Sequence, residues 1–160
     1  SYSSTPIPNK ILLKILKAAQ LAPSAGNIQP WNFIVVKDAR KRKKFAQASY
    51  AKFLVKSPIV IIGCGDQKAS PNWYIVDVSI ALEHMVLTAT SEGLGTCWVG
   101  SFNESEVKEM LKIPENFRVV ALLALGYPRE KTGLTKKIVP ERKKMEDIAS
   151  SEEFGKFKII

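Results

Sequence analysis

The sequence predicts a single domain that combines helices with a buried sheet, and three stretches lead to this prediction. Residues 8–21 carry apolar side chains at helical spacing, with lysines on the opposite face. Residues 58–65 and 119–126 are apolar without alternation, as in strands that are covered on both faces. With 160 residues, 46% of them hydrophobic, the chain is long enough for one domain with a true core and short for two.

The longest predicted helix, residues 72–92, is apolar on nearly all its faces. One apolar stripe includes Val78 and Leu82, and another, on a different face, includes Val76 and Leu87. A monomer of this size has too little other surface to cover such a helix on every side. We therefore expect a second copy of the chain to cover it.

The remaining elements follow from local signals. Strands are expected at residues 31–37 and within residues 93–102, and basic or acidic helices after each of them. Three polar residues are expected to cap the helices that follow them: Asp38, Ser70 and Asn103. Residues 128–160 are charged with scattered apolar side chains, so we expect them to form an arm that packs on the partner subunit.

Composition and charge bear on the class of function. The net charge of +9 would suit nucleic acid, but the cations crowd at residues 37–44 and 129–144 with few aromatics between them, which is typical of solvated faces. The single histidine, His84, leaves no cluster with the spacing of metal ligands. Cys64 and Cys97 lie in apolar runs and are expected to be buried free thiols. Without a membrane-length apolar run or a signal pattern, a cytoplasmic protein is expected.

The stretch APSAGNIQPW, residues 22–31, is the least like ordinary structure. Pro23 and Gly26 are expected to end the preceding helix. Small side chains at residues 24–26 let the backbone approach a flat ligand, and Asn27 and Gln29 offer amide donors and acceptors. The loop is suited to a planar, hydrogen-bonding heterocycle. Alternatively, it is a helix-stop turn whose amides only satisfy the backbone of the loop.

Three separated segments add a second line of inference. They are APSAGNIQPWNFIVV at residues 22–36, EGLGTCWVG at residues 92–100 and ALLALGYP at residues 121–128. In this order and spacing they resemble landmark segments of the nitroreductase family of FMN-dependent NAD(P)H oxidoreductases. The resemblance spans nearly the whole chain. It implies an α+β fold with a central, mainly antiparallel sheet flanked by helices, an intertwined homodimer, and one FMN at each of two subunit interfaces.

The resemblance also implies which residues bind the flavin. The loop that contains Pro23, Ser24, Ala25 and Asn27 would reach the flavin of the other subunit. In the turn formed by Trp98, Val99, Gly100 and Ser101, the last two residues would present backbone N–H groups to flavin N5 and O4. Relatives usually also carry arginines and a serine that bind the FMN phosphate, just before the stretch that matches residues 1–8.

Four more residues receive roles from the resemblance. Lys52 corresponds to a cation near the pyrimidine edge of the flavin, and Arg142 to a basic residue that binds the FMN phosphate. Trp73 and Tyr74 would line the substrate pocket. The alternatives are a solvated charge for Arg142 and helix-end packing for the two aromatic residues.

The implied activity is transfer of hydride from NAD(P)H to flavin N5 and then to a nitroaromatic, a quinone or a similar acceptor, by a ping-pong mechanism. The flavin carries the chemistry, so no side chain is expected to act as acid or base and no metal is needed. Three alternatives stay open: a non-catalytic flavin-binding protein, a specialised relative such as a dehalogenase or a flavin-destroying enzyme, and, from net charge alone, a nucleic-acid-binding protein.

Overall fold

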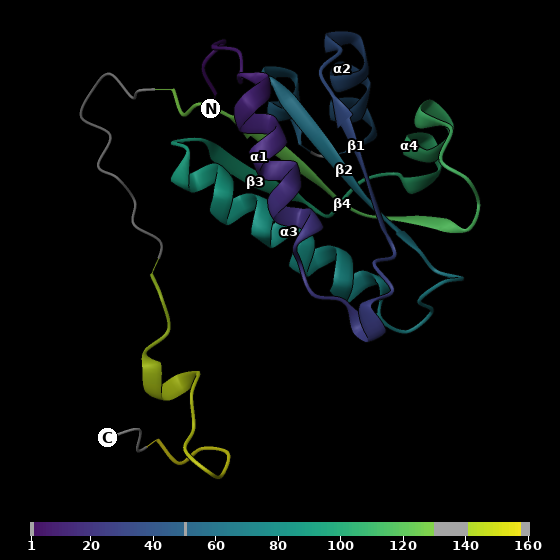
Figure 1. Ribbon diagram of the computed structural model, residues 1–160. Helices are drawn as coiled ribbons and strands as arrows, with labels where there is room; N and C mark the ends of the chain where they lie inside the picture. Colours follow the sequence, from purple (N-terminus) through teal and green to yellow (C-terminus); the bar gives the residue numbers. More distant parts are fainter. Residues whose placement is uncertain (1, 50, 130–140, 158–160) are drawn as a thin grey trace. The chain divides into compact units, whose positions relative to one another are not determined.

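The computed structural model describes residues 2–49, 51–129 and 141–157, in two units that comprise Ser1–Arg129 and Glu130–Ile160. The first unit contains the long helices and the strands (Figure 1). In chain order its elements are α1 (Asn9–Gln20), η1 (Ala25–Asn27), β1 (Trp31–Val36), α2 (Ala39–Ala48), η2 (Lys52–Lys56), β2 (Ile59–Asp66), α3 (Tyr74–Ser91), β3 (Gly95–Val99), α4 (Glu104–Leu111) and β4 (Phe117–Gly126).

The four strands form one sheet in the order β1-β2-β4-β3, and each neighbouring pair is antiparallel. Val36 pairs with Val60 across β1 and β2, and Ile62 pairs with Leu122 across β2 and β4. The two continuously apolar stretches thus form the inner strands, where both faces are buried. The predicted antiparallel sheet is confirmed.

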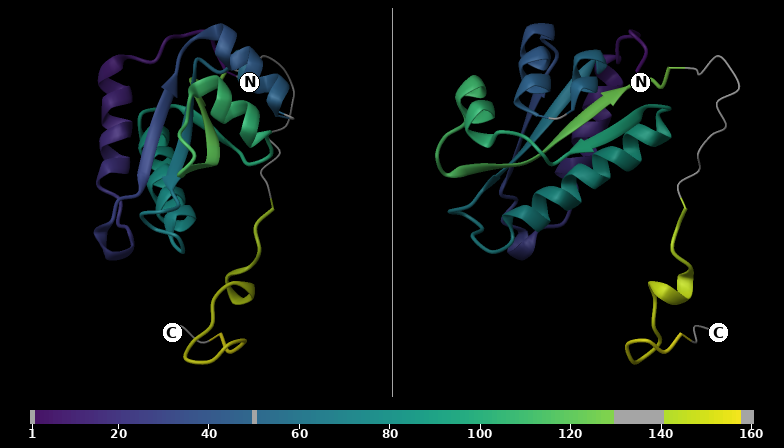
Figure 2. Two further views of the ribbon diagram at one scale, coloured as in Figure 1. Left: turned by 90° about the vertical axis from the view of Figure 1, so that its right-hand side faces the viewer. Right: turned by 180° about the vertical axis from the view of Figure 1, so that it is seen from behind.

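Alternating residues of β2 and β4 separate two cores, one on each face of the sheet. Ile61 and Leu123 face α1 and α3, whereas Ile62 and Leu122 face α2 and α4. The views in Figure 2 show the same three layers, with α1 and α3 on one side of the sheet and α2 and α4 on the other. The period of two along a strand explains this division.

Helix α3 lies very close to β2 because two glycines remove side chains from the strand. A Cβ atom on Gly63 would lie 2.7 Å from Leu82 Cδ1, and one on Gly65 would lie 2.7 Å from Tyr74 Cδ2. A larger residue at either position would force these side chains, or the helix, to shift. The glycines therefore set the depth at which the helix packs.

Two of the three predicted helix caps are confirmed. The carboxylate of Asp38 accepts the N–H of Lys41 at 2.8 Å, and the amide of Asn103 accepts the N–H of Glu106 at 3.3 Å. The prediction for Ser70 is wrong, because residues 70–73 form a turn and α3 begins at Tyr74, with Trp73 at its N-cap.

One of the two expectations about the cysteines is confirmed and the other is wrong. Cys64 is buried on β2, and burial raises the pKa of its thiol to about 12, as a shielded free thiol should behave. Cys97 is exposed, contrary to expectation, because β3 is an edge strand and has no neighbour on its outer side. In the single chain, helix α3 leaves Ile75, Val76 and Leu87 exposed, and the expectation that a second copy covers them stays a prediction.

The described part of the second unit, residues 141–157, contains a short 3₁₀ turn, η3 (Met145–Asp147). Its large apolar residues, Met145, Ile148, Phe154 and Phe157, are all exposed. An arm that packs on a partner subunit stays a prediction. Among the helices of the described residues, none has the length and apolar character needed to span a membrane.

Candidate functional site

The loop between α1 and β1 has an unusual backbone. Helix α1 ends at Gln20, and Gly26 lies within η1 instead of capping the helix, so the expected role of Gly26 as a helix stop is wrong. Gly26, Asn27 and Gln29 have φ values of 57°, 55° and 54°, in the left-handed region. Asparagine tolerates this conformation better than most residues, whereas glutamine has no such advantage.

Several hydrogen bonds within the loop hold its shape. Ser24 Oγ accepts the N–H of Gln29 at 2.9 Å, and the carbonyl of Ser24 accepts the N–H of Asn27 at 3.0 Å. The Gln29 side-chain amide donates to the carbonyl of Asn27 at 3.2 Å. The Gln29 amide therefore satisfies the backbone of the loop, as expected if the loop is only a helix-stop turn. Gly26 and Asn27 lie exposed on the surface.

One residue of α3 joins this loop to the body of the domain. Asp77 is 2% exposed, and its Oδ1 accepts the backbone N–H of Ala25 at 3.0 Å. The bond places the loop beside the first turn of α3. Trp73 and Tyr74 lie at the start of this turn, three to four residues before Asp77. Trp73 is exposed, whereas the Tyr74 ring lies over Gly65, which favours helix-end packing for Tyr74.

The turn after β3 forms a second group of predicted site residues. Trp98, Gly100 and Ser101 are exposed and Val99 is buried. A Cβ atom on Gly100 would meet no other atom within 4 Å, so the backbone there is open to a ligand. This open backbone is a feature that a flat cofactor such as a flavin would need, and the turn fits the group in this respect.

The same turn is held next to the end of α2. Phe102 forms a β-bridge with Ser49, and the carbonyl of Ala48 accepts the N–H of Asn103 at 2.7 Å. Ser49 in turn precedes η2, whose first residue, Lys52, is exposed. A surface pocket of about 410 Å³ lies here, lined in part by Ser49, Ser101 and Asn103.

The loop of residues 23–29 and the far end of the turn, at Phe102, lie on different faces of the sheet, whereas Trp98 pairs with Leu123 and so faces the same side as the loop. The loop of residues 23–29 joins α3, on the face that α1 and α3 cover, whereas Phe102 packs on the opposite core. The pocket beside the turn is not lined by any residue of the loop. Arg142 is exposed and belongs to the second unit, where its Nη1 donates to the carbonyl of Glu141 at 3.5 Å.

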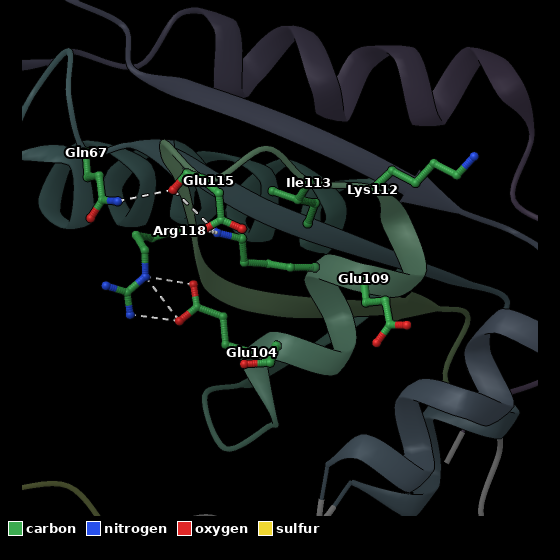
Figure 3. A pocket seen from close by; sticks show the side chains of 9 residues that line it. Gln67, Glu104, Glu109, Lys112, Ile113, Glu115 and Arg118 are labelled. Carbon is green, nitrogen blue, oxygen red and sulfur yellow. Dashed lines mark hydrogen bonds and ion pairs between the residues drawn. The ribbon is translucent and has the colours of Figure 1, made fainter.

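The pocket in Figure 3 lies between α4 and the start of β4 and has a volume of about 560 Å³. Arg118 and Glu104 point toward one another there, with Nε–Oε1 at 2.9 Å and Nη2–Oε2 at 2.8 Å. Glu104 also accepts the N–H of Val119 at 2.9 Å. The hydrogen bond from Arg118 is the main reason why the pKa of Glu104 lies below its usual range. These paired charges hold α4 on the sheet, and none of the predicted site residues lines this pocket.

A further pocket, of about 580 Å³, is basic. Arg42, Lys56 and Arg129 line it together with Ser3 and Ser4. Part of the hydrogen-bonding capacity of the Arg42 guanidinium is used within the protein, because its Nη1 donates to the carbonyls of Val55 and Ser57. These bonds hold α2 to η2.

Sequence reasoning missed the contribution of Asp77. An acidic residue on the inner stripe of a nearly all-apolar helix was the available signal. Its partner, the N–H of Ala25, lies 52 residues away in sequence. No local pattern links the two. Among the described residues, no group of three His, Cys, Asp or Glu side chains is placed to hold a metal ion.

Comparisons with known proteins converge on one family. A family model described as Nitroreductase family matches residues 1–60 and 65–127. A protein of Archaeoglobus fulgidus with the provisional name NADH dehydrogenase/NAD(P)H nitroreductase is 40% identical over 137 residues, which cover 81% of this chain and 79% of that protein. A crystal structure of a nitroreductase family protein from Clostridium novyi has a TM-score of 0.77 at 39% identity, covering 81% of this chain and 79% of that one. A solved FMN-dependent nitroreductase from Clostridium difficile has a TM-score of 0.83 at 28% identity, covering 96% and 93%.

Proposed function

The chain belongs to the nitroreductase family, and on that premise we propose that it is an FMN-dependent oxidoreductase that carries electrons from NAD(P)H to a nitroaromatic, a quinone or a similar acceptor. FMN supplies the hydride chemistry when it is bound. The observation that carries the proposal is the open backbone at Gly100, with Ser101 exposed beside it. Backbone N–H groups at this turn would bind the polar edge of the flavin.

The protein residues would position the cofactor and stabilise charge on it. Lys52 lies at the start of η2, three residues after Ser49, which bridges to Phe102. A cation and fixed backbone dipoles near the flavin would stabilise its reduced, anionic form. Two successive substrates would use the same space, so a ping-pong mechanism is proposed.

We propose a homodimer as the functional form. Ile75, Val76 and Leu87 expose apolar surface along α3, although the helix is buried on its other face. A second copy would cover this surface. It would also bring the loop of residues 23–29 from one subunit to the turn at residues 98–101 of the other. Within one chain, the pocket beside this turn is lined by no residue of the loop.

Arg142 is proposed to bind the FMN phosphate, and riboflavin, which lacks the phosphate, tests this role. A charge-assisted hydrogen bond contributes about 1.5–3 kcal/mol, so Arg142→Ala should weaken FMN about tenfold to a hundredfold. Riboflavin affinity should stay unchanged. Arg129→Ala is the matched control, because Arg129 is another exposed arginine. Equal weakening of both flavins by Arg142→Ala would overturn the role, as would a larger loss of FMN from Arg129→Ala.

The activity itself is tested by steady-state oxidation of NADH and NADPH with a quinone or a nitroaromatic acceptor. The proposal predicts turnover that needs FMN and gives parallel double-reciprocal lines, the pattern of a ping-pong mechanism. A protein that binds FMN but oxidises neither nucleotide would contradict it and support the non-catalytic, flavin-binding alternative.

A further inference from the structure

We infer that Asp77 is a positioning residue for the cofactor: its buried carboxylate fixes the loop of residues 23–29 in the conformation that binds FMN. The inference rests on the proposed function, because it assigns a role toward the same flavin site. Asp77 would act through the loop, without touching the flavin.

Asp77 is an unusual residue for its surroundings. It is 2% exposed and lies on the inner side of α3, between the buried core and the turn that contains Ser70. In the described parts of the chain, the other buried polar residues are serines, and no ion pair involves Asp77. A carboxylate taken out of water is costly unless hydrogen bonds satisfy it. An apolar side chain at this place would serve packing alone, so the carboxylate needs another explanation.

Both oxygens of the carboxylate have a donor. Oδ1 accepts the N–H of Ala25 at 3.0 Å, and Oδ2 lies 3.5 Å from the hydroxyl of Ser70, which is itself 2% exposed. The bond to Ala25 spans 52 residues of sequence and joins the loop to the first turn of α3. Asp77 therefore links the loop to a rigid helix.

The loop needs such a link because its other hydrogen bonds are internal. Ser24 bonds Asn27 and Gln29, and these two residues hold left-handed backbone conformations. The buried residues Ala22 and Pro30 fix the two ends, but the residues between them are exposed or half-buried. Without the bond to Ala25 the loop would sample more conformations, and ordering it would reduce the affinity for its ligand.

Two substitutions separate the hydrogen bond from the charge and the packing. In Asp77→Asn the amide oxygen still accepts from the N–H of Ala25, and the NH₂ group donates to the Ser70 hydroxyl. In Asp77→Ala both bonds are lost. Val60→Ala is the control for stability, because it truncates a buried side chain of β2 on the opposite face of the sheet.

The dissociation constant of FMN is measured by flavin fluorescence on the full chain, together with Tm and hydrogen exchange of the Ala25 amide. Loss of one hydrogen bond predicts that Asp77→Ala raises the Kd about tenfold, whereas Asp77→Asn stays within about threefold of wild type. The Ala25 amide should exchange faster in Asp77→Ala alone. Val60→Ala should lower the Tm and leave the Kd unchanged.

Each other result overturns the inference. If Asp77→Asn weakens FMN as much as Asp77→Ala, the charge matters and the hydrogen bond does not. If Asp77→Ala and Val60→Ala raise the Kd equally for an equal loss of Tm, Asp77 has a structural role only. If the wild-type chain binds no FMN, the proposed function fails and the role of Asp77 toward FMN fails with it. Faster exchange of the Ala25 amide in Asp77→Ala would then show only that Asp77 holds the loop.

Discussion

Both faces of α3 carry an apolar stripe in sequence, but the two stripes differ in the structure. On the inner face, Leu82 and Met85 are fully buried, and Leu82 packs against the bare backbone of Gly63. On the outer face, Leu87 is 62% exposed and Val76 is 45% exposed. The hydrophobic pattern predicts that a face will be covered, whereas it does not say which chain covers it.

The difference separates what one chain builds from what we propose that two chains build. The inner face belongs to the core of the domain, and its contacts are present in the monomer. We propose that a second copy of the chain covers the outer face and completes the site. Substitutions on the two faces should therefore have different kinds of effect.

Leu82→Ala is expected to have the largest effect on stability. The side chain is completely buried, so truncation should cost about 2–5 kcal/mol of unfolding free energy through lost burial and the cavity it leaves. Urea unfolding measures this loss. Leu87→Ala is the matched control, because the same chemical change on the exposed face should cost the folded monomer no more than about 0.5 kcal/mol. Equal losses that do not depend on protein concentration would contradict the distinction between the faces.

Leu87→Glu tests the outer face. A charge placed in the proposed interface would be buried without a partner, which should weaken association by about 2 kcal/mol or more. Sedimentation equilibrium should show a shift from twice the chain mass of 17.8 kDa toward that mass. Leu13→Glu is the control, because Leu13 on α1 is 65% exposed and lies outside the proposed interface. Loss of the dimer in both variants, or in neither, would place the interface elsewhere.

Helix α4 is held on the sheet mainly by an ion pair, in contrast to the buried face of α3. Loss of this pair should have a smaller effect on stability, and that effect should depend on pH. The helix buries only Val107 and is tied to β4 by the pair of Glu104 and Arg118. Because the folded-state pKa of Glu104 is lowered, its stabilisation is complete above the ordinary pKa of about 4.3 and is lost as the pH falls through the folded value. Glu104→Gln should cost about 1 kcal/mol at neutral pH and less near pH 3. Urea unfolding at both pH values measures the difference, and an equal cost at both would argue against it.

The fold was largely predictable because its signals are local. The apolar runs at residues 58–65 and 119–126 became the inner strands β2 and β4, and the caps at Asp38 and Asn103 begin their helices as expected. The prediction of a helix cap at Ser70 is wrong because serine and proline, which are typical of helix starts, are also typical of turns. The exposure of Cys97 depends on its strand lying at the edge of the sheet, which no local pattern states.

The candidate site was predictable in part. The family, the enzyme class and the flavin cofactor that the three segments predicted agree with the comparisons, and the open backbone at Gly100 suits the role assigned to it. The contact of Asp77 with Ala25 was not predictable, because it joins residues that are distant in sequence. The roles of Lys52 and Arg142 stay predictions.

Sedimentation velocity of the FMN-loaded protein, followed by the visible absorbance of the flavin, tests the account most directly. We predict that the flavin sediments with a particle of twice 17.8 kDa and that this particle holds one FMN per chain. Flavin on a particle of single-chain mass, or no flavin on the protein after incubation with excess FMN, would contradict a cofactor site built from two copies of this chain.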